Sequence, residues 1–461
     1  MNKFSFPSTG IWIRHFRKDI LPFWQKAQRH GGLFHTYLRR DATPVLLDGD
    51  IVHEDFAPLC DEVRPRLRRR YTRCLSRLIF LYGVAYHLTG SQKYLSTAQR
   101  GMRLLLAARE PDGQFASWVV QGRKGPAPMH RTSQDMAYAL VGPAFYYYLT
   151  RDPAVEAMLI AAWQSIFAMR KIPSGHLSWV AESWDDYGFP MHATEIQLVA
   201  QLDQLNAYLV LLARLLPEYW KAQAIQQVKE LARLIHRAYY NPTHNLFWGC
   251  LDDPKQMCYG GHHVDFGHTA KSFWMLHLIG SHFDDAELAS FAAHNGRRLL
   301  DEAFLQRQGT WGMRQGEEPQ QYIWWIHCEL DQLAATLALE DSSVIRYLNS
   351  SYAFWLEHFV DHTHGEVWHT IDTNFSPRYP KVYHWKSGYH TAEHALVGAL
   401  TDAALSGKKQ TLYFATNNDG EYFFPYYFNG KIYSQQRILM HNRFQKISVT
   451  FENIGLYAHN S

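Results

Sequence analysis

The sequence is poor in charged residues and contains no long apolar run. Charged residues make up 19% of its 461 residues, and the formal net charge is +3, with one short basic block at 64–70. This composition gives little electrostatic support for nucleic-acid binding. No stretch approaches the ~18–20 apolar residues of a membrane span, and the N-terminal residues lack the apolar core of a signal peptide. We therefore expect a cytoplasmic protein with neither nucleic-acid nor membrane partners.

Cysteine is also scarce. The five cysteines are odd in number and form no C-x-x-C pair, which argues against a disulfide framework or a cysteine-type zinc site. They are Cys60, Cys74, Cys250, Cys258 and Cys328, and we expect buried thiols. The cluster of His262, His263 and His268 lacks the i,i+4 helical spacing with a nearby acidic ligand, so we expect no metal site there.

Aromatic residues, at 15%, and 26 histidines are abundant instead, and helical periodicity runs from end to end. In 219–240, for example, apolar residues recur every three or four positions with polar ones between them. The periodicity predicts twelve helices, at about 10–30, 64–89, 92–108, 133–150, 154–170, 193–216, 219–240, 267–280, 286–305, 319–340, 342–361 and 389–406.

A weak repeat organises these helices. After each odd-numbered helix comes a short turn that is followed by an aromatic residue. These segments are Gly32–Phe34, Gly113–Phe115, Gly175–Trp179, Asn245–Trp248, Gly309–Trp311 and Gly365–Trp368. Longer loops follow these turns, and short links join even to odd helices. The even helices, such as 133–150, are apolar nearly all round, so we expect them to lie inside amphipathic outer ones.

We therefore predict an all-α fold, an (α/α) toroid of six helical hairpins over residues 1–407, with a cavity at its loop end. An open solenoid fits less well, because its terminal repeats would be polar caps. The last residues differ: 411–415, 422–428, 431–433 and 446–451 read as strands. We expect a β-rich extension over 408–461, packed on the barrel.

Each even-numbered helix carries an ionisable or amide group in an otherwise apolar run. These groups are Arg77, Gln134, Asp135, Tyr138, Gln201, Asp203, Asp265, His268, Lys271, His327, Glu329, His390 and Glu393. A lone histidine on an apolar helix is more often a hydrogen-bonded core residue than a catalyst. Buried charges are costly unless they are paired, however, so their recurrence at equivalent positions predicts one shared polar pocket.

At four of these places the chain resembles the N-acylglucosamine 2-epimerase superfamily over about residues 10–406. The matching motifs are Arg77, Gly267-His268, the segment Trp324–Glu329 (WWIHCE) and the segment Trp385–His390 (WKSGYH). The resemblance implies the six-hairpin toroid. It also implies that Arg77 contacts a substrate oxygen, that His268 and His390 are the two acid/base groups, and that Glu329 supports them.

Three positions depart from the superfamily. Lys271 stands where the family has Glu, and Glu393 stands where its epimerases have Arg, so the two signs are exchanged. We expect Lys271 and Glu393 to face each other as an inverted ion pair. On the sixth helix, Gln201 or Asp203 occupies the place of a histidine that is frequent in the family.

The chemistry implied is epimerisation or isomerisation of a reducing-end sugar, of the mannose/glucose type or a disaccharide such as cellobiose. One imidazole removes the C2 proton to give a cis-enediolate and the other returns a proton, a task that suits groups titrating near neutral pH. Arg77 would stabilise the oxyanion. No cofactor is needed, and we expect a monomer or homodimer. The expected substrate-binding residues are Gln134, Tyr138, Asp203, Lys271, Trp311, Trp324, Trp325, Trp385 and Glu393.

Two alternatives remain open at this point. A glycoside hydrolase or lyase on the same ring would need two carboxyl groups about 5–5.5 or 6.5–9.5 Å apart, and the candidates are Asp185, Asp186, Asp265 and Glu329. The other alternative is a sugar-binding homologue that has lost catalysis, which the lysine at position 271 would fit.

Overall fold

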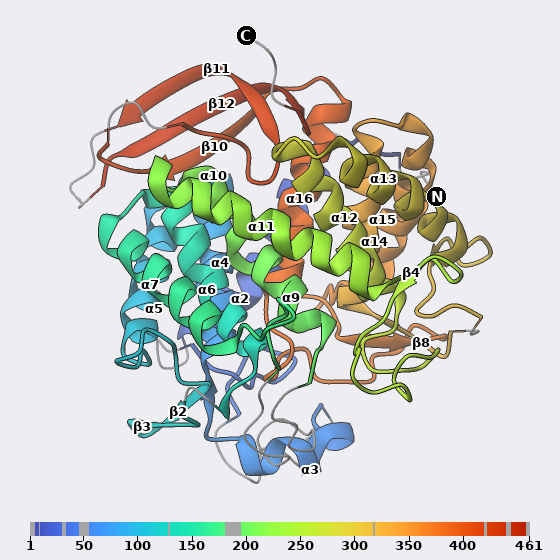
Figure 1. Cartoon of the computed structure of the whole chain (residues 1–461). Coiled ribbons are helices and arrows are strands. Elements are labelled where there is room, and N and C mark those ends of the chain that lie inside the picture. The colour runs from blue at the N-terminus through green and yellow to red at the C-terminus, as the bar shows by residue number, and fades with distance from the viewer. Residues whose placement is uncertain are drawn as a thin grey trace.

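The computed structural model describes residues 5–8, 10–29, 34–45, 55–127, 130–179, 195–316, 319–418, 422–438 and 444–457. Helical segments occupy all twelve predicted positions (Figure 1). They are α1–η1–α2 (Ile11–His15, Phe16–Ile20, Leu21–Arg29), α4 (Thr72–Thr89), α5 (Gln92–Leu106), α6 (Ser133–Thr150), α7 (Pro153–Arg170), α9–η6–α10 (Leu198–Gln204, Leu205–Leu209, Val210–Leu215), α11 (Glu218–Tyr239), α12 (Phe266–His282), α13 (Ala286–Ala303), α14 (Trp324–Ala338), η7–α15–η8 (Ser342–Val344, Ile345–Phe354, Trp355–Phe359) and α16 (Tyr389–Leu405). Short helical pieces η3 (Ala57–Leu59), α3 (Cys60–Val63) and η4 (Arg64–Arg66) precede α4. No helix of the described ranges has the length and apolar character to cross a membrane.

Burial alternates along this series of helices. Helices α4, α6, α9–α10, α12, α14 and α16 are buried on nearly every side, whereas α5, α11 and α13 bury one stripe. The buried helices before α16 pack against the helix that follows them, as α4 does against α5 and α12 against α13. The last helix, α16, packs against the first, α1, and also against α4, so the two ends of the helical series meet.

The predicted aromatic repeat corresponds to one recurring turn. Five equivalent positions have positive φ, a conformation that favours Gly and Asn: Gly113, Gly175, Asn245, Gly309 and Gly365. Around each turn the chain pairs back on the end of the preceding helix, as Arg109 does with Phe115 and Lys171 with Leu177. In the first predicted copy, Gly32 and Leu33 lie outside the described residues.

Short strand pairs explain where the predicted helix boundaries differ from those of the structure. Helix α4 begins at Thr72 rather than at 64, because β1 (Arg70–Tyr71) pairs with β2 (Trp118–Val120), which pairs with β3 (Arg123–Lys124). Helix α14 begins at Trp324 rather than at 319, because β8 (Gln321–Ile323) pairs with β9 (Thr370–Asp372). Two further pairs join β4 (Tyr240–Asn241) to β5 (Leu246–Phe247) and β6 (Phe304–Leu305) to β7 (Thr310–Trp311). The partners of β1 and β8 are distant in sequence, so helical periodicity alone does not reveal these two pairs.

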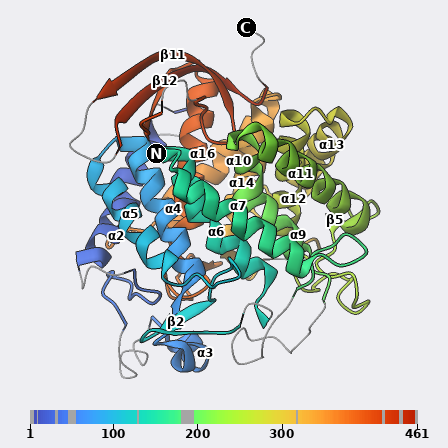
Figure 2. The same cartoon turned by 60° about the vertical axis from the view of Figure 1, so that its left-hand side comes forward.

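The C-terminal residues form an antiparallel sheet in the order β10–β12–β11 (Gln410–Ala415, Lys446–Gly455 and Asn429–Ile438). The sheet covers the end of the helices opposite to α3, β2 and β3 (Figures 1 and 2). Its β10 strand packs on α4 and α6, and β12 packs on α16. The strand predicted at 422–428 is wrong: its described residues lie outside the strands, and Tyr426 has a φ of 57°. Five of its aromatic side chains are buried and Tyr422 is exposed, so most of the apolar pattern there reflects packing in the core.

The cysteines are all free thiols. Cys74, Cys250 and Cys328 are buried as predicted, whereas Cys60 is half-buried and Cys258 is exposed.

Candidate functional site

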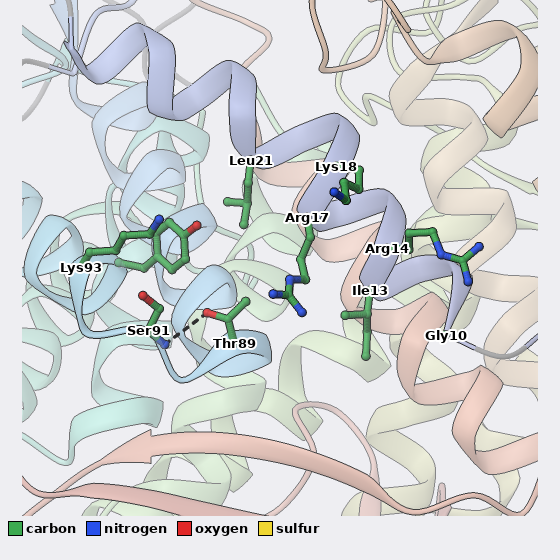
Figure 3. A pocket seen from close by; sticks show the side chains of 10 residues that line it. Gly10, Ile13, Arg14, Arg17, Lys18, Leu21, Thr89, Ser91 and Lys93 are labelled. Atoms are coloured by element: carbon green, nitrogen blue, oxygen red, sulfur yellow. Dashed lines mark hydrogen bonds between the residues drawn. The ribbon is translucent and has the colours of Figure 1, made fainter.

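Two cavities differ in the chemistry of their walls. The larger, of about 560 Å³, is a groove between α1–η1 and the link from α4 to α5, with Arg14, Arg17, Lys18 and Lys93 around it (Figure 3). None of its described lining residues carries an imidazole, carboxyl or thiol group, so it lacks the groups that exchange protons near neutral pH. The other, of about 300 Å³, is the candidate site.

The 300 Å³ cavity gathers residues from six separate parts of the chain. Its lining residues are Arg77, Gln134, Tyr138, Asp203, His263, His268, Lys271, Trp324, Trp325, Glu329, His369, Tyr383, Trp385 and His390. All the site residues predicted from the sequence are among them except Trp311 and Glu393. Of the thirteen groups predicted to share one polar pocket, eight line this cavity, whereas Asp135, Gln201, Asp265, His327 and Glu393 do not.

His268 lies at the start of α12, where Asp265 is the N-terminal capping residue. The Asp265 Oδ1 atom accepts a hydrogen bond from the backbone N–H of His268 at 2.8 Å, and its Oδ2 atom is 2.7 Å from the His268 Nδ1 atom. The Trp325 ring packs edge-on against the imidazole with centroids 4.7 Å apart. A Cβ atom at Gly267 would lie 2.6 Å from the Trp325 ring, so glycine is what allows this approach.

His390 is the second imidazole, at the start of α16. Its Nδ1 atom lies 3.6 Å from Oε1 of Glu329, and Trp274 donates a hydrogen bond to the other carboxyl oxygen at 2.8 Å. Burial lowers the pKa of His390 well below its ordinary value, and the positive charges of Arg77 and Lys271 lower it further. Burial raises the pKa of Glu329 to about 8. At neutral pH, His390 is therefore neutral and most of Glu329 is protonated.

The predicted ion pair between Lys271 and Glu393 is wrong. The Lys271 Nζ atom forms its ion pair with Asp203 and also donates to the Tyr138 hydroxyl at 3.1 Å. Burial alone would lower the pKa of Lys271, but Asp203 and Tyr138 outweigh it and the pKa is raised, so the amine stays charged. Glu393 does not line the cavity and instead accepts from the Tyr426 hydroxyl at 2.7 Å.

Asp203 connects three side chains of one cavity wall. Besides Lys271, it accepts hydrogen bonds from Gln134 at 2.8 Å and from the Tyr138 hydroxyl at 3.2 Å. The sequence offered two candidates on helix α9, Gln201 and Asp203. Asp203 lines the cavity, whereas Gln201 is fully buried and forms hydrogen bonds with the backbone of Leu177.

Arg77 lies next to Tyr138, one of the side chains that Asp203 binds. Its guanidinium lies 4.0 Å over the centroid of the Tyr138 ring and donates to the Trp385 carbonyl oxygen at 3.0 Å. The Arg77 side chain lines the cavity with a fixed orientation, which suits a group that contacts a developing negative charge.

Trp311 does not belong to the cavity, which corrects the prediction that it binds substrate. Its indole is buried against Phe304 and Tyr347 and donates a hydrogen bond to Asp331 at 2.8 Å. The aromatic residue of the repeated turn serves the packing of the outer helix here.

Three lining residues were missed from the sequence. His263 packs edge-on against His268 at 4.7 Å, and the His369 ring lies 4.4 Å from that of Trp324. Tyr383 approaches His369, with its hydroxyl 3.0 Å from Nε2. His369 directly follows the last repeated turn, and that proximity was the available signal. Within the described ranges, no group of three or more His, Cys, Asp or Glu side chains is placed to hold a metal ion.

Comparisons with known proteins address the fold and the family. No protein-family model matches the chain. By sequence it is similar to a cellobiose 2-epimerase of Bacteroides fragilis, with 21% identity over 336 residues that cover 68% of this chain and 83% of that protein. By structure it is similar to a D-mannose isomerase, with a TM-score of 0.69 and 15% identity over 87% of this chain and 100% of that one.

A family 76 glycoside hydrolase from a bovine Bacteroides thetaiotaomicron strain is a more distant structural relative. Its TM-score is 0.56 at 10% identity, over 87% of this chain and 79% of that one. The same helical fold thus carries different reactions, and the fold by itself does not choose between them.

Proposed function

We propose that this chain, which resembles the N-acylglucosamine 2-epimerase superfamily in sequence and in fold, is an isomerase of reducing-end sugars. The observation that carries the proposal is the placement of His268 and His390 in one cavity, on different helices, with both rings near that of Trp325. Their rings lie 4.7 and 6.4 Å from the Trp325 ring, respectively. Similarity to a cellobiose 2-epimerase and to a D-mannose isomerase supports the same class of reaction.

The reaction begins at the open-chain aldose. One imidazole takes the proton from C2, and the C–H electron pair becomes the C1–C2 double bond of a cis-enediolate, with negative charge on O1. The second imidazole returns a proton to the opposite face of C2, which gives the epimer. A proton returned to C1 with loss of the O2 proton gives the ketose instead. Neutral His390 is ready to accept a proton, as a general base must be.

The other lining residues take supporting roles in this proposal. Arg77 stabilises the oxyanion with its positive charge, in a site where burial strengthens electrostatic interactions. Glu329 orients His390 through Nδ1. Asp203, Lys271 and Tyr138 bind sugar hydroxyls, and the rings of Trp324, Trp325 and Trp385 cover its apolar C–H faces.

The glycoside hydrolase alternative is less well supported by the carboxyl groups. Those among the described lining residues are Asp203 and Glu329. Asp203 forms an ion pair with Lys271 and accepts from Gln134 and Tyr138, and Asp265 is engaged with His268. A hydrolase needs two carboxyl groups free to act on the glycosidic bond. Asp185 and Asp186 lie outside the described residues.

The fold proposal that accompanies this function is the six-hairpin (α/α) toroid of residues 1–407, with 408–461 as an extension packed on it. The contact of α16 with both α1 and α4 supports closure of the ring. The contacts of β10 and β12 with α4, α6 and α16 support the extension's packing.

The deciding experiment incubates the protein with mannose, glucose and cellobiose in deuterated water and follows C2 by NMR. Deuterium at C2 with formation of the C2 epimer or the ketose, and without bond cleavage, is the expected result. Release of monosaccharide from cellobiose would show a hydrolase, and saturable binding without exchange would show a binding protein. Both outcomes contradict the proposal.

The matched pair of variants is His390→Gln and His364→Gln. His364 lies exposed on a loop, so its substitution should leave exchange unchanged. Loss of exchange in His390→Gln alone attributes the activity to this cavity rather than to a contaminating enzyme.

A further inference from the structure

Asp265 does more than cap the start of helix α12. Asp285, for comparison, caps α13 by accepting from the backbone N–H of Leu288 at 3.2 Å. In Asp265 one carboxyl oxygen caps α12, and the other meets the ring of the same residue that donates the capping bond, His268. A single carboxylate therefore holds both the backbone and the imidazole of His268.

We propose that Asp265 is the positioning residue for His268, which it holds with the proton on Nδ1 so that Nε2 faces the cavity. A neutral imidazole has one donor and one acceptor nitrogen. Because an ionised carboxylate only accepts, Nδ1 must carry the hydrogen and Nε2 is left to exchange a proton with the sugar. The proposal rests on the proposed function for the identity of the reacting proton.

The surroundings of Asp265 agree with this role. Its side chain is 12% exposed. Burial alone would raise the pKa of Asp265, but its electrostatic interaction and hydrogen bonds with His268 outweigh it and the pKa is lowered, so the carboxylate is ionised. The imidazole is also held by ring contacts on two sides, with His263 and Trp325, each at 4.7 Å. Rotation of the ring is therefore opposed from several directions.

The lysine at position 271 explains why the carboxylate that contacts the His268 ring belongs to Asp265 and not to a residue one turn later on α12. Lys271 lies one turn after His268 on α12, and its amine is engaged with Asp203 and Tyr138. A cation there cannot accept a hydrogen bond from an imidazole N–H. The side-chain ion pair of His268 among the described residues runs to Asp265. In this chain the helix cap thus supplies the charge that orients the base.

The test separates positioning from capping. In Asp265→Asn the amide oxygen can still cap α12, because Asn is as good a cap as Asp, and the NH₂ group then points at Nδ1. An NH₂ donor requires Nδ1 to accept, which moves the proton to Nε2. We expect kcat to fall about 10²–10⁴-fold with a small change in KM, as when a carboxylate that sets a histidine tautomer becomes an amide. The unfolding midpoint should not change.

The spectroscopic readout is ¹⁵N NMR of histidine-labelled protein, with the His268 signals identified by their loss in His268→Gln. The wild type should show the Nδ1–H form and Asp265→Asn the Nε2–H form. Asp265→Ser keeps a capping oxygen without reaching the ring, so it should show a mixture of tautomers. Asp285→Asn is the matched cap control and should change neither kcat nor the His268 spectrum.

Three outcomes overturn the proposal: wild-type kcat in Asp265→Asn, an unchanged His268 tautomer in that variant, or a loss of kcat that tracks a lowered unfolding midpoint. The tautomer measurement needs no substrate. If the wild type shows no exchange at C2 with any sugar, the proposed function fails, while the spectrum still decides whether Asp265 positions His268.

Discussion

Substitution of Glu329 by glutamine should stabilise the protein while it lowers the activity. The Glu329 side chain is 3% exposed, and burial raises its pKa from 4.5 to about 8. Between these two pH values the folded protein keeps a proton on Glu329 that the unfolded chain releases. Stability therefore falls as pH rises through this window. Glutamine cannot ionise, and its carbonyl oxygen can still accept the hydrogen bond from Trp274.

The magnitude follows from the two pKa values. The difference between 4.5 and about 8 corresponds to about 4–5 kcal/mol once the pH is above 8, about 3 kcal/mol at pH 7 and about 1 kcal/mol at pH 5. Glu329→Gln should thus differ little from the wild type at pH 5 and be more stable by several kcal/mol at pH 9. Titrating groups that do not interact with Glu329 are common to both proteins and cancel in the difference.

The assay is urea unfolding of both proteins at pH 5, 6, 7, 8 and 9. Glu357→Gln serves as the control, because Glu357 is exposed on the outer helix η8 and its substitution should give a difference that does not vary with pH. A stability difference between Glu329→Gln and the wild type that stays flat from pH 5 to 9, or that shrinks as pH rises, would refute the reasoning. The same variant should lose kcat, because it can no longer orient His390 as a carboxyl group does.

Three further predictions concern the buried side chains His390, Asp331 and Trp274. His390→Gln should lower kcat by about 10²–10⁴-fold with little change in the unfolding midpoint, measured by C2 exchange and by thermal unfolding. Asp331→Asn should destabilise the fold by about 3–5 kcal/mol in urea at pH 7, because the buried carboxylate accepts from His394 and Trp311 at 2.8 Å; an unchanged midpoint would contradict this. Trp274→Phe should raise the pKa of Glu329 further, since it removes a donor to the carboxylate, and this would move the basic limb of the kcat–pH profile to higher pH.

Most of the helices and most of the cavity residues were predictable because their signals are local. Helical periodicity lies within one segment, and the repeated Gly or Asn marks a turn that needs positive φ. Helices that are apolar all round must lie inside, so many of the charges on them face one central cavity, although Asp135 and His327 pair elsewhere with Arg73 and Asp331. His268, Glu329 and His390 came together in one cavity for this reason.

The partner of Lys271 was not predictable in the same way. The exchange of signs at 271 and 393 suggested that these two side chains meet, but on helices that are apolar all round the sequence does not indicate which neighbouring helix a side chain faces. Asp203, on a third helix, forms the ion pair with Lys271. Glu393 accepts a hydrogen bond from Tyr426, which lies in a segment predicted as a strand. Pairing of buried charges depends on distances between several helices, which periodicity does not specify.

Position 393 also shows how the C-terminal residues reach the candidate site. Glu393 is 3% exposed, burial raises its pKa, and the Tyr426 hydroxyl is its hydrogen-bond donor. The Tyr427 ring packs 5.8 Å from that of Trp274, which in turn donates to Glu329. Tyr427 also donates to the backbone oxygen of Asn206 at 2.8 Å. In the proposed function Glu329 orients His390, so residues after 407 support the candidate site, and a division of the chain at 407 separates the site from part of its support.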